Sequence, residues 1–100
     1  MTTILQIVLF ITFLASPNSD NCQGETVDGV QQGHWQCFYD NGKVREEGDY
    51  QQGKKSGHWK FYHENGNLAL EGSYENGLEK GSWKMYDESG NQLDTIEYGN

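Results

Sequence analysis

Histidines and carboxylates are the side chains of this chain that could hold a metal ion. His34 and His58 are 24 residues apart, and the same step relates Asp40, Glu64 and Glu88. In the repeat described below, residues one step apart lie two strands apart, roughly 10 Å. Zinc ligands lie about 2.0–2.3 Å from the ion, so two equivalent residues cannot share one. The sequence therefore predicts neither a metal site nor a cofactor, and these positions are interpreted as solvated.

Nucleophilic catalysis is the second chemistry to consider. No Ser, Cys or Thr is placed by a motif beside a base that could activate it. His34 and His58 hold one position of the repeat, and Ser82 fills that position one step later. This substitution is typical of a structural position, and we expect no enzymatic activity.

The chain has two cysteines, Cys22 and Cys37. An even count in a secreted chain favours a disulfide, and closing a loop of about 15 residues contributes about 3 kcal/mol. Cys37 also holds the position of Phe61 and Met85 in the later units, where a thiol would serve as a small apolar side chain. The sequence leaves both interpretations open.

A 24-residue repeat organises the chain after residue 19. Trp35, Trp59 and Trp83 follow this step, and four series of glycines keep it. A 12-residue period runs inside it through Phe38, Tyr50, Tyr62, Tyr74, Tyr86 and Tyr98. Such a period indicates units that stack to bury a common core. We divide the chain into units 33–56, 57–80 and 81–100, preceded by a degraded half-unit at 20–32.

Each unit is predicted to be a β-hairpin. In the middle unit Trp59 and Phe61 alternate with polar residues, the pattern of a strand with one buried face. Residues 63–66 (HENG) carry the Asn-Gly turn signal. A four-residue loop would place Phe61 opposite Leu68 and Trp59 opposite Leu70, and directly opposed residues share a face. The predicted repeat core is Trp35, Trp59, Trp83, Phe61, Leu68, Leu70, Tyr50 and Tyr74.

Phe38, Tyr62 and Tyr86 have the opposite parity and are expected on the more polar face. Either they shield the backbone of a thin sheet, or they form a recognition strip for sugars, cationic groups or an extended polypeptide. The fold class predicted from these patterns is all-β. It is a single-layer, twisted antiparallel sheet of about three consecutive hairpins, preceded by an N-terminal signal segment.

The pattern E-G-x-Y-x-x-G-x-x-x-G-x-W-x-x-Y-x-x-x-G spans residues 71–90, and residues 47–66 match it in the same way. It resembles the MORN repeat (membrane occupation and recognition nexus), and its step resembles the bacterial variant, some carriers of which are labelled antitoxins. The resemblance covers about residues 24–98. It implies an elongated sheet used for recognition or scaffolding, without catalytic residues. A weaker likeness to the aromatic-glycine repeats of choline-binding cell-wall proteins implies a sugar or choline ligand.

Residues 1–19 contain no charged side chain and hold an apolar run at residues 4–15. A membrane-spanning helix needs about 20 apolar residues, whereas a secretory signal needs about 7–15. We expect a signal peptide at residues 1–19, cleaved between Ser16 and Cys22. An uncleaved anchor and a buried segment are the alternatives.

The chain carries 15 acidic and 7 basic residues, a net charge of −8. This excess argues against nucleic acid and anionic membrane surfaces as partners, because both select Lys and Arg. The sequence predicts a non-enzymatic, secreted or periplasmic module that binds another protein, as a scaffold or in an immunity or antitoxin-like role. The alternatives are a cell-envelope module that binds carbohydrate or choline through its aromatics, and a structural extracytoplasmic spacer.

Overall fold

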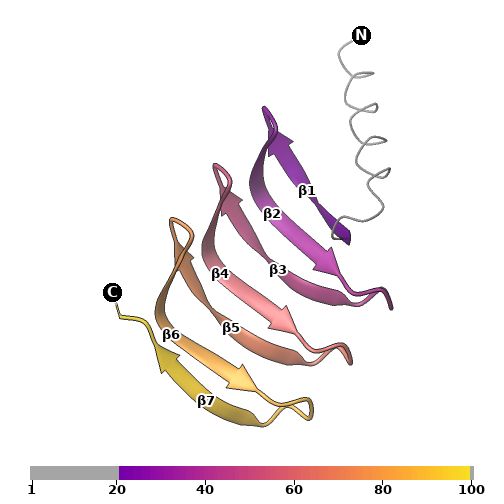
Figure 1. Cartoon of the computed structure of the whole chain (residues 1–100), viewed down its shortest axis with the longest axis vertical. Coiled ribbons are helices and arrows are strands. Elements are labelled where there is room, and N and C mark those ends of the chain that lie inside the picture. The colour runs from indigo at the N-terminus through magenta and orange to yellow at the C-terminus, as the bar shows by residue number, and fades with distance from the viewer. Residues whose placement is uncertain (1–20, 100) are drawn as a thin grey trace.

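The computed structural model describes residues 21–99, which form one antiparallel sheet of seven strands in sequence order (Figure 1). The strands are β1 Asn21–Val27, β2 Val30–Phe38, β3 Val44–Gln51, β4 Lys54–Tyr62, β5 Leu68–Glu75, β6 Leu78–Tyr86 and β7 Gln92–Glu97. The predicted all-β sheet of consecutive hairpins is confirmed. The expected signal segment lies outside the described residues.

Two kinds of turn alternate along the sheet. The strand pairs β1–β2, β3–β4 and β5–β6 are joined by two residues that both have positive φ. These residues are Asp28-Gly29, Gln52-Gly53 and Asn76-Gly77. Positive φ at both positions defines the type I′ turn, whose twist suits a tight hairpin. The turns at the other end of the sheet are longer.

The longer turns correct the register predicted for the middle unit. The His63 N–H donates to the Asn67 carbonyl at 2.8 Å, so these two residues face each other across a three-residue loop. Tyr62 then pairs with Leu68, and one extra residue in β5 shifts the next pair to Phe61 and Leu70. The predicted four-residue loop was therefore wrong. Leu68 lies on the face of Tyr62 and not in the tryptophan patch, because opposed residues share a face.

Each tryptophan lies over a glycine of the preceding strand. Glu47 of β3 pairs with Lys60 of β4, and Asp49 pairs with Ser56. Between these two pairs β3 has one residue, Gly48, whereas β4 has three, residues 57–59. Gly57, with a φ of 72°, allows β4 to bulge there. A methyl group built on Gly48 would overlap the indole of Trp59.

The indole N–H of each tryptophan is satisfied by the same geometry. Trp59 Nε1 donates to the Asp49 carbonyl at 3.0 Å. Trp35 lies over Gly24 and donates to the Glu25 carbonyl at 2.9 Å. Trp83 lies over Gly72 and donates to the Ser73 carbonyl at 3.1 Å. Trp59 and Trp83 are only 1 % and 2 % exposed. The recurring Glu-Gly and Gly-x-Trp elements therefore form one packing unit across two strands.

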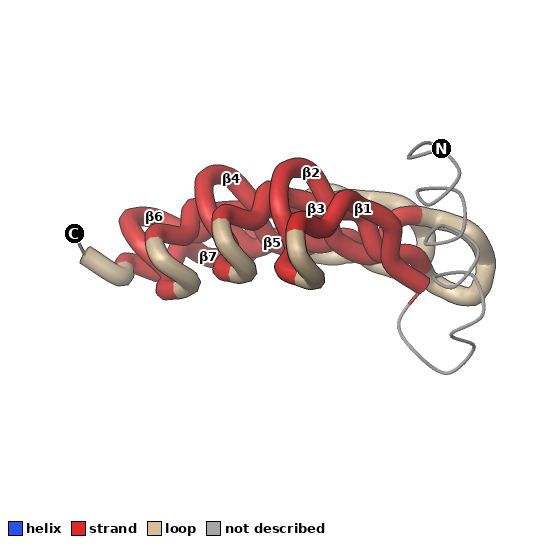
Figure 2. Tube along the Cα trace, turned by 90° about the horizontal axis from the view of Figure 1, so that it is seen from above, coloured by secondary structure: helices blue, strands red, loops and turns tan. Residues whose placement is uncertain are grey.

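The core is a ladder of aromatic rings on one face of the layer. Edge-to-face contacts with centroids 5.0–6.1 Å apart link, in order, Trp35, Tyr50, Trp59, Tyr74, Trp83 and Tyr98. Phe61 lies between Trp59 and Trp83, 6.1 Å from each. Figure 2 shows the strands curving within a single layer. The rings thus cover one another, and the opposite face is left for polar groups.

Candidate functional site

The face opposite the aromatic ladder carries a polar cluster that occurs twice. In the first copy, Glu47 of β3 is held from both sides. Tyr62 of β4 donates its hydroxyl to Glu47 Oε2 at 2.5 Å. His34 of β2 places Nε2 3.6 Å from Glu47 Oε1 and Nδ1 3.2 Å from Asp49 Oδ1. Gln36 donates to the same Oε1 at 3.0 Å.

The second copy lies 24 residues further along. His58 Nε2 lies 3.0 Å from Glu71 Oε1, and Tyr86 donates its hydroxyl to Glu71 Oε2 at 3.0 Å. Next to it, Ser82 takes the place of the histidine and donates to Glu97 at 2.7 Å. We call the two complete clusters, His34–Glu47–Tyr62 and His58–Glu71–Tyr86, the polar ladder. Each cluster spans three neighbouring strands, so the sheet register itself aligns the two copies.

The two glutamates of the polar ladder are kept ionised by hydrogen bonds from other members of their own clusters. The hydrogen bond from Tyr62 holds the pKa of Glu47 below its usual 4.5, against the opposing effect of partial burial. Partial burial opposes ionisation of Glu71 too, but hydrogen bonds from His58 and Tyr86 outweigh it and lower its pKa. Burial and the bond to Glu47 raise the pKa of Tyr62 to about 12. Both carboxylates are therefore ionised and both hydroxyls protonated at neutral pH.

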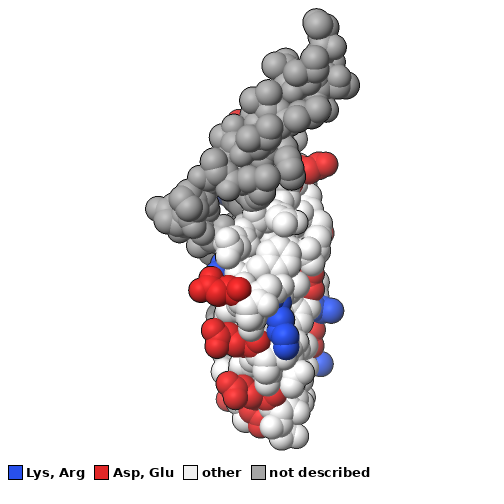
Figure 3. All heavy atoms as spheres, turned by 90° about the vertical axis from the view of Figure 1, so that its right-hand side faces the viewer, with Lys and Arg blue, Asp and Glu red and all other residues white. Residues whose placement is uncertain are grey.

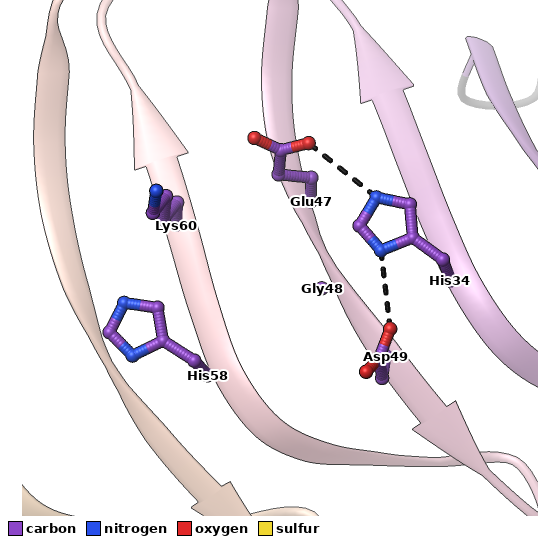
Figure 4. A pocket seen from close by; sticks show the side chains of 6 residues that line it. All are labelled: His34, Glu47, Gly48, Asp49, His58 and Lys60. Atoms are coloured by element: carbon purple, nitrogen blue, oxygen red, sulfur yellow. Dashed lines mark hydrogen bonds and ion pairs between the residues drawn. The ribbon is translucent and has the colours of Figure 1, made fainter.

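A shallow hollow of about 260 Å³ opens beside the first cluster. Figure 4 shows His34 bridging Glu47 and Asp49 on one side, with His58 and Lys60 of β4 on the other. The histidines and Asp49 are more than half exposed. The hollow therefore offers both acceptors and a cationic donor to a molecule that lies on this face.

The chemistry of this arrangement favours recognition. Both histidines are occupied by carboxylates, and a tyrosine with a raised pKa is a poor acid and a poor nucleophile at neutral pH. Within residues 21–99, no three metal-ligating side chains converge on one point. In the same part of the chain, no helix is long and apolar enough to span a bilayer.

The predicted strip of Phe38, Tyr62 and Tyr86 lies on the polar face, on alternate strands. All three side chains are half-buried. The two tyrosine hydroxyls donate to glutamates of the preceding strand, bonds that no pattern in the sequence predicted. Tyr62 and Tyr86 of the strip are thus part of the polar ladder, whereas Phe38 is not, and the exposed neighbours of the two tyrosines are the histidines.

The other predicted residues are distributed as follows. Trp35, Trp59 and Trp83 are buried, and Phe61, Leu70, Tyr50 and Tyr74 are half-buried. Cys22 and Cys37 face each other across β1 and β2 and are joined by a disulfide. Asp40, Glu64 and Glu88 lie in the long turns, and His63 contacts the Tyr86 carbonyl at 2.9 Å.

The long turns stack on one another along one side of the sheet, at the strand ends where β2, β4 and β6 finish. Asn41 donates to the Glu64 carbonyl at 3.0 Å, and Asn65 donates to the Glu88 carbonyl at 2.9 Å. Figure 3, which looks onto this side of the molecule, shows acidic side chains in a column. The row of long turns is therefore held together by hydrogen bonds and borders the polar face with acidic side chains.

Two of the hairpins match a known protein family. A family model described as the MORN repeat variant matches residues 31–52 and 55–76. The first match covers β2 and β3 and the second covers β4 and β5. MORN repeats are generally non-catalytic modules that bind proteins or membranes. No curated protein and no solved structure matches the chain.

Proposed function

We propose that this chain is a non-enzymatic, secreted or periplasmic repeat module that binds another protein through the polar ladder. One observation carries the proposal: the ordered cluster of histidine, glutamate and tyrosine occurs twice on the face that the aromatic core does not use. Side chains already held by internal bonds lose little entropy when a partner binds them.

The location and the finer role are part of the same proposal. The apolar, charge-free residues 1–19 support export, and the net charge of −8 disfavours an anionic membrane surface as the partner. The match to MORN repeats supports a protein partner. Scaffolding and an immunity or antitoxin-like role both require such a partner.

The carbohydrate or choline alternative receives less support from the aromatic face. Ligands of that kind stack on exposed rings or enter open aromatic cages. Here the three tryptophans are buried, and the ammonium group of Lys55 lies 4.7 Å from the Trp59 ring centroid and 5.3 Å from those of Phe61 and Tyr74. The chain thus fills this cage with its own cation.

The test begins with cross-linking and capture of partners from the native extracytoplasmic fraction, followed by titration of the purified partner. We expect His34→Ala/His58→Ala to weaken binding about tenfold, a loss of about 1.4 kcal/mol, which is typical when an energetically important interface residue is truncated. Lys54→Ala/Leu78→Ala, two exposed substitutions beside the short turns, is the matched control and should bind normally. Equal affinities of both variants would remove the polar ladder as the interface, and failure to recover any partner would overturn the proposed function.

A further inference from the structure

Net charge alternates from strand to strand across the sheet. Strand β3 has three acids and one base, and β4 has three lysines and no acid. Strand β5 has two acids, β6 has two lysines and one acid, and β7 has two acids. From β3 onward, each acidic strand thus lies beside a basic one.

The strand register places acidic residues of one strand opposite lysines of the next. Glu47 lies directly opposite Lys60, and Glu71 lies opposite Lys84. Lys80 forms an ion pair with Glu75 at 2.8 Å. Opposite charges that face each other across strands stabilise the pairing. The inner acidic strand β5 has a basic strand on each side. The acidic strands β3 and β7 each have one on one side only, and only β7 has its other side open within residues 21–99.

Strand β7 is an open edge within residues 21–99. It pairs only with β6 in that region, and all six of its residues are exposed. Leu93 is 61 % exposed, and Tyr98, just after the strand, is 48 % exposed. Natural edge strands are commonly protected by lysine, proline or a bulge that turns the edge away. β7 contains no Lys, Arg or Pro, and its one irregularity, at Leu93 near its start, leaves residues 94–97 in regular register with β6.

We propose that β7 pairs with an extended, basic segment of a partner protein, which adds an eighth strand to the sheet. This inference rests on the proposed function as a protein-binding module and names the second surface that such a partner would use. Strand β4 shows the composition that suits an acidic neighbour, with two lysines at its start and a third, Lys60, in its second half. Backbone hydrogen bonds would supply affinity, and Asp94 and Glu97 would select the basic sequence.

A second copy of this chain fits the edge poorly. The other edge of the sheet within residues 21–99, β1, contains one acid and no base, so head-to-tail pairing would set two acidic strands side by side. The inner strands also accept a tryptophan from the next strand over Gly48 or Gly72, whereas the equivalent position of β7 is Ile96, opposite Trp83. An isoleucine leaves no room for an indole, and β1 brings no tryptophan, so a contact between β7 and β1 would not repeat the inner packing.

The experiment titrates the full chain with a synthetic peptide in which lysine alternates with valine and threonine. Two control peptides replace every lysine with glutamate, or two central residues with proline. We expect the lysine peptide to bind, and the backbone amides of β7 to become protected from hydrogen exchange. The glutamate peptide should fail through repulsion, and the proline peptide because it cannot complete the hydrogen-bond ladder.

Charge variants complete the test. Asp94→Lys/Glu97→Lys should bind the lysine peptide about three- to tenfold more weakly, in keeping with the modest strength of exposed charge pairs. Asp40→Lys/Glu64→Lys makes the same charge change in the long turns and should bind like the wild type. Equal losses in both variants, equal binding of the proline peptide, or unprotected β7 amides would overturn strand pairing. None of these results depends on the native partner or on His34 and His58, so the proposed function stands or falls separately.

Discussion

At the scale of single residues, the fold depends on glycines that seat tryptophans. Gly24, Gly48 and Gly72 each lie under an indole, and no side chain would fit there. A thin sheet has no second layer to bury its rings, so the backbone itself has to cover one side of each indole. The absence of a Cβ is what permits that close approach.

We predict that Gly72→Ala destabilises the protein by about 1–3 kcal/mol, because the added methyl overlaps the Trp83 ring and forces it to move. Urea denaturation measures the loss in the free energy of unfolding. The same substitution in a Trp83→Leu background should be nearly neutral, which a double-mutant cycle would report as strong coupling. Additive losses would show that the glycine is needed for another reason.

The polar ladder predicts a specific acid response. The pKa of Glu47 is lower in the folded protein than its usual 4.5, so its bonds stabilise the fold fully above that value. This stabilisation is lost as the pH falls below 4.5 and through the lowered pKa. Tyr62→Phe removes the main cause of the shift. We expect the variant to be less stable by about 0.5–1.5 kcal/mol at neutral pH, with the difference shrinking in acid.

Tyr39→Phe is the matched control for that measurement. The Tyr39 hydroxyl donates to the Tyr62 carbonyl at 2.5 Å, so its acceptor does not titrate. Denaturation curves across the acidic range should show a constant difference between Tyr39→Phe and the wild type. A constant difference for Tyr62→Phe as well would contradict the assignment of the Glu47 shift to Tyr62.

At the scale of elements, β1 is held differently from the other strands. It is an edge strand with mostly exposed side chains, and it pairs only with β2 in the described part of the chain. The Cys22–Cys37 disulfide ties it to β2 at directly opposed positions. The disulfide therefore takes the place of the packing that an inner strand obtains from a second neighbour.

We predict that Cys22→Ala/Cys37→Ala loosens β1 without unfolding the rest of the sheet. A cross-link that closes a loop of about 15 residues is worth about 3 kcal/mol. Hydrogen exchange should therefore accelerate by at least about tenfold at the β1 amides. The amides of β4 and β5 should change little, since β1 pairs only with β2 among residues 21–99. A uniform acceleration over all strands would mean that β1 and the rest unfold as one unit.

At the scale of the whole molecule, the sheet is a one-dimensional array. Each strand packs mainly against its two neighbours in the sequence, and each 24-residue unit repeats the same contacts. The stability of such an array is approximately the sum of its units and of their interfaces. The length of the array is therefore adjustable in whole units.

We predict that deleting residues 57–80 leaves a folded, shorter sheet. The deletion joins Ser56 to Gly81, which restores the Ser-Gly junction of β4 and the spacing of glycines and tryptophans. The dependence of the unfolding free energy on urea should fall by roughly a third, in proportion to the surface that unfolding exposes. Deleting residues 57–78 breaks the 24-residue step and should abolish folding. Similar stability of the two deletions would contradict a register-dependent array.

The sequence by itself determined the strands, their order and the face of the tryptophans. These features are local, because alternation of apolar and polar residues and turn pairs such as Asn76-Gly77 act over a few residues. The 24-residue step then propagated one hairpin into an array. The aromatic ladder could be predicted for the same reason, since its members recur at equal spacing on one face.

Only the tertiary structure decided which residues meet across strands. A single extra residue in β5 moved Leu68 to the side of Tyr62, and the bulge of β4 placed Trp59 over Gly48 of β3. No pattern along one strand shows such a bulge, because it arises from how two strands fit each other. The histidine–glutamate–tyrosine clusters depend on that fit, since each joins three strands. Their residues recur visibly in the sequence, but the register alone brings them within hydrogen-bonding distance.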